Sequence, residues 1–266
     1  MRPFHHKIEN DYFNLYPLMD FHLGSPQCDE DLIHKVIAEI YDDPWARWCG
    51  VGDLIENALP TSLGDMYQQI LPPEEQMIRI AKWLRPIREK GLFIINGNHE
   101  DRTYKRCGHH PESHISALIG VDEKNNVPYV PFLGLTVYAA FMLDVKPPNT
   151  FKVFFHHNTG GGQTIGGKTN KALKLEYLCP SADAVVSGHT HITSRVSRQW
   201  FTTTGHKIIE KQTVHYVGGS ALRYEGSYAE QKALLPACRE LIRVRFAARN
   251  NGHHDSRSQE YSVVRP

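Results

Sequence analysis

The chain has 266 residues, of which 41% are hydrophobic and 22% are charged, the composition of a folded soluble domain rather than of a disordered chain. Its 30 Lys and Arg residues against 29 Asp and Glu residues give a net charge of +1, which excludes a broad basic surface for long nucleic acids. It has no apolar run of about 18 residues that could span a membrane, and its start shows no secretory signal, so we expect a cytoplasmic protein without a membrane partner.

Short apolar runs predict five strands, buried on both faces, in the first two-thirds of the chain. They cover residues 13–19, 46–51, 92–95, 151–155 and 184–186. Helical patterns lie between them, at residues 31–41, 73–90 and 170–178. Because strands alternate with helices, the fold class that we expect is α/β.

The last third of the chain changes to β-type runs without helices. These runs, at 192–201, 207–217 and 240–247, predict an antiparallel sheet packed beside the first. The chain contains no repeat and no Pro/Ser-rich linker, so we expect a single domain over residues 1–248. Residues 249–266, RNNGHHDSRSQEYSVVRP, are predicted to form a polar tail.

Each of the five predicted strands is followed by side chains that can bind a metal. In chain order the segments are DFH at 20–22, GDLIEN at 52–57, GNHE at 97–100, HH at 156–157 and GHTH at 188–191. In open α/β sheets the ligand crevice lies beyond the carboxyl ends of the strands, so we expect these segments to converge. Carboxylates and imidazoles without a thiolate favour zinc, iron or manganese. Seven candidate ligands exceed one tetrahedral site and predict two ions that share a bridging carboxylate.

The order of these segments, D-x-H, G-D-x-x-E, G-N-H-E, H and G-H-x-H, resembles that of the calcineurin-like metallophosphoesterases across residues 20–191. The resemblance implies a four-layer α/β/β/α sandwich of two mixed sheets and a metal-dependent phosphoesterase activity. It also implies the metal ligands: Asp20, His22, Asp53 and His191 for the first ion, and the bridging Asp53 with Asn98, His156 and His189 for the second. His99 would stabilise the phosphoryl oxygens or protonate the leaving group. We expect two divalent ions, Mn²⁺ first, with iron, zinc or nickel as alternatives.

Two details of these segments concern neighbouring residues. His156 is favoured over His157 as the ligand, because the family's histidine is usually followed by one variable residue and then by Pro or Asn, and HHN at 156–158 fits that pattern. Glu56 and Glu100 are expected to orient the neighbouring loops rather than to bind metal.

The middle of the chain also contains the sequence pattern of a nucleotide-binding P-loop, from Gly162 to Thr169. A P-loop needs its first glycine directly after a buried strand. Here the residues HHNTGG follow the strand first, and the glycines of the pattern come only after them. A P-loop nucleotide-binding protein is therefore the least favoured alternative. We predict instead a mobile loop at 160–168 at the mouth of the metal site, with Lys168 contacting a substrate phosphate. The alternative is a surface connection in which Lys168 only starts a helix.

Basic residues follow the third ligand segment. Arg102, Lys105 and Arg106 stand beside Tyr104. Cationic groups with an aromatic ring suit a nucleotide or a short nucleic-acid end, although a solvated basic face has the same composition. We expect a phosphodiesterase for a nucleotide or nucleic-acid substrate. The alternatives are a phosphomonoesterase or protein phosphatase, and a non-catalytic metal-binding scaffold.

Overall fold

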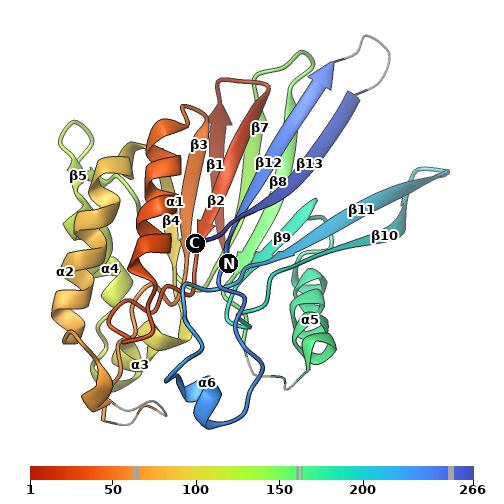
Figure 1. Ribbon diagram of the computed structural model, residues 1–266. Helices are drawn as coiled ribbons and strands as arrows, with labels where there is room; N and C mark the ends of the chain where they lie inside the picture. Colours follow the sequence, from red (N-terminus) through yellow and green to blue (C-terminus); the bar gives the residue numbers. More distant parts are fainter. Residues whose placement is uncertain (61, 63–65, 160–161, 163, 251–254) are drawn as a thin grey trace.

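The fold consists of two mixed β-sheets packed face to face, with helices on their outer sides (Figure 1). The structure is a computed structural model that describes residues 1–266 except 61, 63–65, 160–161, 163 and 251–254. Apolar side chains of the two sheets share one inner core, and helices pack on the outer face of each sheet. This four-layer arrangement confirms the predicted fold class.

The five-stranded sheet carries the first three predicted ligand segments. Its strands lie in the order β13 (Asp255–Val264), β12 (Leu241–Asn250), β2 (Tyr12–Leu18), β3 (Ala46–Val51) and β4 (Gly91–Ile95). Since β2, β3 and β4 are parallel, their carboxyl ends share one edge of the sheet. Its outer face is covered by α1 (Glu30–Asp42), α2 (Pro73–Leu84) and α4 (Pro111–Ile119).

The six-stranded sheet carries the other two segments. Its strands lie in the order β1 (Arg2–Ile8), β7 (Thr136–Leu143), β8 (Asn149–His156), β9 (Ala184–Ser187), β11 (Lys207–Val217) and β10 (Ser194–Thr204). Because β8, β9 and β11 are parallel, the segments after β8 and β9 leave the sheet at the same edge. Side chains of the short helix η3 (Lys174–Leu178), which continues α5 (Ile165–Leu173), pack on its outer face.

Aromatic side chains pack between the two sheets. Phe13 of β2 lies with its ring centroid 5.0 Å from that of Phe141 in β7 and 5.3 Å from that of Phe246 in β12. Phe93 of β4 meets Phe155 of β8 at 5.1 Å. All five rings are fully buried, and their dense packing fixes the carboxyl ends of one sheet relative to those of the other.

Several shorter elements connect these strands and helices. α3 (Asn98–Cys107) begins directly at the third ligand segment. The remaining described elements are η1 (Met66–Gln68), η2 (Arg85–Lys90), the hairpin strands β5 (Val121–Asp122) and β6 (Val127–Pro128), and α6 (Tyr228–Gln231). In the part of the chain that the structure describes, no helix combines the length and the apolar character needed to cross a bilayer.

The last third of the chain departs from the prediction of a separate antiparallel sheet. β10 and β11 extend the six-stranded sheet beyond β9, while β12 and β13 extend the five-stranded sheet beyond β2. The predicted polar tail is also wrong, since β13 pairs antiparallel with β12 from Asp255 to Val264. As an edge strand, β13 has a half-exposed face, which explains its polar sequence.

Two predicted helices have different bounds. The helix expected at 73–90 becomes α2 followed by η2, because Pro86 has no N–H for the α-helical ladder. The helix expected at 170–178 begins earlier, at Ile165. The side chain of Thr164 caps it by accepting a hydrogen bond from the Gly167 N–H.

Candidate metal centre

The five ligand segments converge at the carboxyl ends of β2, β3, β4, β8 and β9, as predicted. Their ligand atoms form three overlapping groups, each with all its atoms within 4.8 Å of one another. The groups are Asp20, His22 and His191; His22, Asp53 and His99; and Asp53, His157 and His189. The site therefore lies across both sheets, and neither sheet alone contains it.

The first group combines the segments after β2 and β9. His191 Nε2 lies 3.2 Å from Asp20 Oδ1 and 3.1 Å from His22 Nε2. Two imidazole nitrogens that face each other at this distance and share a carboxylate can all bind one cation. On its other side, the ring of His22 is held by Glu56, with 3.1 Å between His22 Nδ1 and the carboxylate, the kind of contact that orients a histidine ligand.

The third group, with Asn98 beside it, combines the segments after β3, β4, β8 and β9. His157 Nε2 lies 3.1 Å from Asp53 Oδ2 and 3.1 Å from the Asn98 amide oxygen. The other nitrogen of His157 is 2.7 Å from the carbonyl oxygen of Val51. That carbonyl can only accept, so Nδ1 carries a proton and Nε2 is the atom directed at the group.

Asp53 occupies the position of a bridge. Its Oδ2 atom lies 3.1 Å from His157 Nε2 in one group and 4.0 Å from His22 Nε2 in another. It is fully buried, and its Oδ1 accepts a hydrogen bond of 2.9 Å from the backbone N–H of His99. Asp53 is thus held from several sides between the two sets of ligands.

Of the two adjacent histidines, the structure brings His157 to the ligand groups, and not His156, the predicted ligand. The strand β8 ends at His156, and its buried residues Val153 and Phe155 face the inner core. Because side chains alternate along a strand, His157 continues on the same side as Phe155. His156 instead lies beside Phe154 on the outer face, with 6.4 Å between ring centroids, and its Nδ1 accepts the backbone N–H of Asn158.

The charges of the site fit a cation. Every ion pair that Asp20 or Asp53 forms within the described part of the chain is with a histidine. Burial would raise the pKa of Asp53, but His157 and His99 hold it well below its usual range. Burial would lower the pKa of His157, but Asp53 raises it to about 10. Buried carboxylates are stable only beside positive charge. Divalent ions can supply that charge in place of the protons on the histidines.

The backbone of the site is held in an uncommon conformation. Five predicted ligands have positive φ angles between 51° and 70°: Asp20, His22, Asp53, His189 and His191. Non-glycine residues in this region cost about 1 to 3 kcal/mol each and cluster at functional sites. The loops after β3 and β8 also approach each other closely. A Cβ atom added to Gly52 would lie only 2.7 Å from His157 Nδ1, which is too close for any larger residue.

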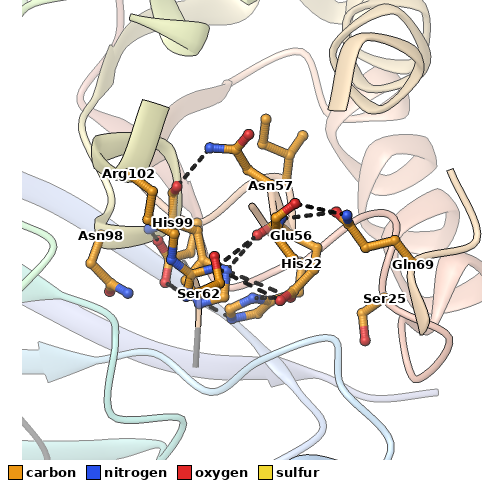
Figure 2. Close-up of polar contacts among 12 residues, drawn as sticks. His22, Ser25, Glu56, Asn57, Ser62, Gln69, Asn98, His99 and Arg102 are labelled. Atoms are coloured by element: carbon orange, nitrogen blue, oxygen red, sulfur yellow. Dashed lines mark hydrogen bonds and ion pairs between the residues drawn. The ribbon is translucent and has the colours of Figure 1, made fainter. Parts of the chain in front are cut away.

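Two glutamates orient the ligand loops, as predicted. The buried carboxylate of Glu100 accepts hydrogen bonds from the N–H groups of Asp53 at 3.0 Å and Ile55 at 3.2 Å. Figure 2 shows His22 and His99 converging on Glu56. His22 meets the Glu56 carboxylate, whereas His99 Nδ1 lies 2.7 Å from the Glu56 carbonyl oxygen.

The predicted substrate-contacting cations separate into two sets. Arg102 and Lys168 line a cavity of about 490 Å³ that also exposes His22, His99, His189 and His191. Lys105 and Arg106 are exposed and do not line it, and Lys105 pairs with Asp101 instead. The site lies at the N-terminus of α3, and at about 1.5 Å per residue these two side chains start roughly 10 Å further along the helix.

Lys168 lies within α5 rather than at its start, with its Nζ donating to the carbonyl oxygen of Thr190 at 2.9 Å. It therefore reaches the loop that carries His189 and His191. Of the predicted mobile loop at 160–168, residues 160, 161 and 163 lie outside the described residues.

Sequence reasoning missed two parts of the site. Asn57 donates to the carbonyl oxygen of His99 at 2.7 Å and to Thr103 Oγ1 at 2.9 Å, which fixes the start of α3; its only signal was its place at the end of the second ligand segment. The cavity is also lined by residues between 222 and 237. That segment has little regular structure and no periodic pattern that could have indicated a role.

Comparisons with known proteins give similarity in structure only. No protein-family profile and no curated protein matches the sequence. Vacuolar Protein Sorting 29 from Cryptosporidium parvum is similar with a TM-score of 0.39 and 12% identity, over 95% of this chain and 99% of that one. A conserved uncharacterized protein from Streptococcus pneumoniae, described as a predicted phosphoesterase, has a TM-score of 0.36 and 12% identity over 94% and 98% of the two chains. With TM-scores below 0.5, neither similarity is evidence for an activity.

Proposed function

We propose that this protein is a phosphoesterase that uses two divalent ions, and that it hydrolyses phosphodiesters of nucleotides or nucleic acids. One observation carries the proposal: the carboxylate of Asp53 belongs to two of the three ligand groups and lies where a bridging ligand is needed. The ordered motifs that resemble the calcineurin-like metallophosphoesterases support it independently.

The ligands divide between two ions that share Asp53. One ion would be held by Asp20, His22, Asp53 and His191, and the other by Asp53, Asn98, His157 and His189. When bound, such ions supply Lewis-acid stabilisation of phosphoryl oxygens and lower the pKa of water into the neutral range. The nitrogen and oxygen donors suit Mn²⁺, with iron, zinc or nickel as alternatives.

His99 is placed to handle a proton. Because the Glu56 carbonyl can only accept, the 2.7 Å contact keeps a proton on His99 Nδ1. His99 lines the cavity, and its other nitrogen, Nε2, lies 3.9 Å from Asp53 Oδ2. Burial lowers the pKa of His99 to about 4, so Nε2 holds a second proton only when the negative charge of a phosphate is beside it. In that state it can stabilise a phosphoryl oxygen or protonate the departing one.

Arg102 and Lys168 add positive charge at the mouth of the centre. Both line the same cavity as the histidines. Arg102 is partly neutralised by Glu56, at 4.0 Å from one carboxylate oxygen. Lys168 donates to a backbone carbonyl, so its charge is available to an anionic substrate.

The test is a substrate comparison on protein loaded with Mn²⁺. We expect hydrolysis of bis-p-nitrophenyl phosphate to exceed that of p-nitrophenyl phosphate, followed by hydrolysis of nucleotide diesters. Asp53→Asn, which keeps the size of the side chain but removes its charge, should abolish the activity. A preference for the monoester would refute the phosphodiesterase assignment, and equal activity in Asp53→Asn would refute the site.

A further inference from the structure

The cavity beside the metal centre continues into an apolar half. At one end it is lined by the site histidines, Arg102 and Lys168. The other end is lined by aliphatic and aromatic side chains, mostly from the segment that surrounds α6: Pro26, Leu222, Tyr224, Ala229, Leu234, Leu235 and Ala237. We call these residues the apolar wall. None of them binds metal or belongs to the motifs in the sequence.

The apolar wall faces the cavity and not the protein core. Leu234 is 36% exposed and Leu235 is 43% exposed. Among the described residues, the wall leucines belong to none of the buried hydrophobic clusters. Apolar side chains grouped at the end of a concave site are typical of surfaces that receive a ligand.

Both ends of the wall segment are tied to the ligand loops. The N–H of Arg223 donates to the carbonyl oxygen of Gln27 at 2.9 Å, shortly after His22 in the chain, and the N–H of Cys238 donates to the carbonyl oxygen of His191 at 2.8 Å. Within the segment, Tyr224 Oη donates to the carbonyl oxygen of Leu234 at 3.0 Å. In Figure 1, α6 lies at the same edge of the sheets as α3 and α5. The wall is thus held in place relative to the metal ligands.

The charges of the cavity differ between its two ends. Lys168 and Arg102 lie at the metal end. Among the described residues of the wall segment, Arg223 is the cation that lines the cavity, and it is paired with Asp29 at 3.1 Å, so the apolar end has little free charge. A ligand that matches both ends has an anionic group at one side and an apolar or aromatic group at the other.

We propose that the substrate is a discrete, nucleotide-sized phosphodiester whose base-sized aromatic group rests on the apolar wall, while its phosphate binds at the metal end beside Lys168. This inference rests on the proposed function and names its substrate class. A cavity of about 490 Å³ is within the usual range of about 300 to 1,000 Å³ for small-molecule sites. Because the cavity has the volume of a small-molecule site and the net charge is only +1, a free nucleotide ester fits it better than an internal position of a polymer.

The experiment compares two diesters that share a p-nitrophenolate leaving group: the p-nitrophenyl ester of thymidine 5′-monophosphate and methyl p-nitrophenyl phosphate. For the Mn²⁺-loaded protein, we expect kcat/KM to favour the thymidine ester by about 10- to 100-fold, the usual effect of filling an apolar subsite. In Leu235→Ser this ratio should fall about tenfold. Ile208→Ser, a matched change at a 74% exposed residue of β11 outside the cavity, should keep the ratio.

A binding measurement gives a second readout. Calorimetric titration should show that thymidine 5′-monophosphate binds more tightly than inorganic phosphate, and that Leu235→Ser reduces this preference. If both diesters are cleaved with equal kcat/KM and Leu235→Ser does not change the ratio, the wall assignment is refuted while the proposed function stands. If neither diester is cleaved by metal-loaded protein, the proposed function fails as well. If the protein cleaves internal bonds of an oligonucleotide faster than it cleaves the thymidine ester, the choice of a small substrate is refuted.

Discussion

At the scale of single residues, the candidate site depends on which ligand atoms face one another. Asp53 belongs to two of the ligand groups, and His157, directly after β8, joins one of them while its neighbour His156 points to the other side of the strand. The sequence HHN does not distinguish these two histidines by composition. The alternation of buried residues before them does, since Val153, Phe155 and His157 share one side.

Replacing the two adjacent histidines separately tests this assignment. His157→Ala removes a nitrogen that lies 3.1 Å from Asp53, so we expect metal affinity and phosphodiesterase activity to fall at least about 100-fold, more than for a residue that only orients a ligand. His156→Ala should retain both. Metal content by elemental analysis and kcat/KM on bis-p-nitrophenyl phosphate are the measurements, and the reverse pattern would restore His156 as the ligand.

His99 should behave as a proton donor and not as a ligand. In His99→Gln the ring that can hold a second proton is lost, and kcat should fall by about 100- to 1,000-fold. The metal content should stay equal to that of the unaltered protein, because the other ligands remain. Loss of one ion together with the activity would show that His99 binds metal.

At the scale of elements, α4 contains an unusual buried acid. Glu112 is 1% exposed, and within the described part of the chain neither of its carboxylate oxygens has a hydrogen-bond partner. Its Oε2 lies 3.9 Å from His110 Nδ1. Burial, with Glu100 and then Asp101 of α3 adding to it, raises the pKa of Glu112 to about 9. The folded protein therefore keeps this proton at neutral pH.

This raised pKa predicts a loss of stability as the pH rises. Below 4.5, the ordinary pKa of the group, Glu112 is protonated in both the folded and unfolded states. Between 4.5 and about 9 only the unfolded state releases the proton, so the free energy of unfolding falls by about 1.4 kcal/mol per pH unit from this residue. In Glu112→Gln that contribution should disappear.

The measurement is urea unfolding of chelator-treated protein at pH 5, 7 and 8.5 for the unaltered chain and Glu112→Gln. Glu75→Gln, on the exposed side of α2, is the control and should keep the original pH dependence. The same slope in Glu112→Gln as in the unaltered chain would show that Glu112 ionises normally in the folded state.

Elements also differ in how clearly the sequence encodes them. β3 and β9 could be predicted because nearly all their residues are buried and most of them are apolar. β1 could not, because it is a mostly exposed edge strand with two adjacent histidines. α3 was missed as well: only Glu100 of its residues is buried, so it has no apolar stripe. The start of this helix is fixed instead by a hydrogen bond from Asn57, which lies far away in the sequence.

At the scale of the whole molecule, the candidate metal centre forms because two sheets meet. The core between them should therefore be the main source of stability. Phe13→Ala removes a buried ring that contacts Phe141 and Phe246 and should lower the free energy of unfolding by about 3 to 5 kcal/mol. Phe201→Ala, at a 71% exposed position of β10, should change it by less than about 0.5 kcal/mol. Equal effects of the two changes in urea unfolding would contradict this view of the core.

The molecule also shows what the sequence could indicate about the site. The motifs after the strands predict which segments converge, because parallel strands bring their carboxyl ends to one edge. They do not predict the apolar wall, since the position of residues 222–237 depends on hydrogen bonds to the distant residues Gln27 and His191. They also place Lys105 and Arg106 too near the site, because spacing in the sequence does not show the direction in which α3 leads away from it.

The most direct test of the central claim is the number of metal ions bound per chain. After loading with Mn²⁺ and removal of free metal, elemental analysis should give two ions per unaltered chain, because Asp53 belongs to two of the three overlapping ligand groups. Asp53→Asn should hold fewer than two, and Asp101→Asn, an acid on α3 that pairs with Lys105, should hold two. Unaltered protein that binds no ion, or Asp53→Asn that retains both, would contradict the assignment of a dinuclear centre.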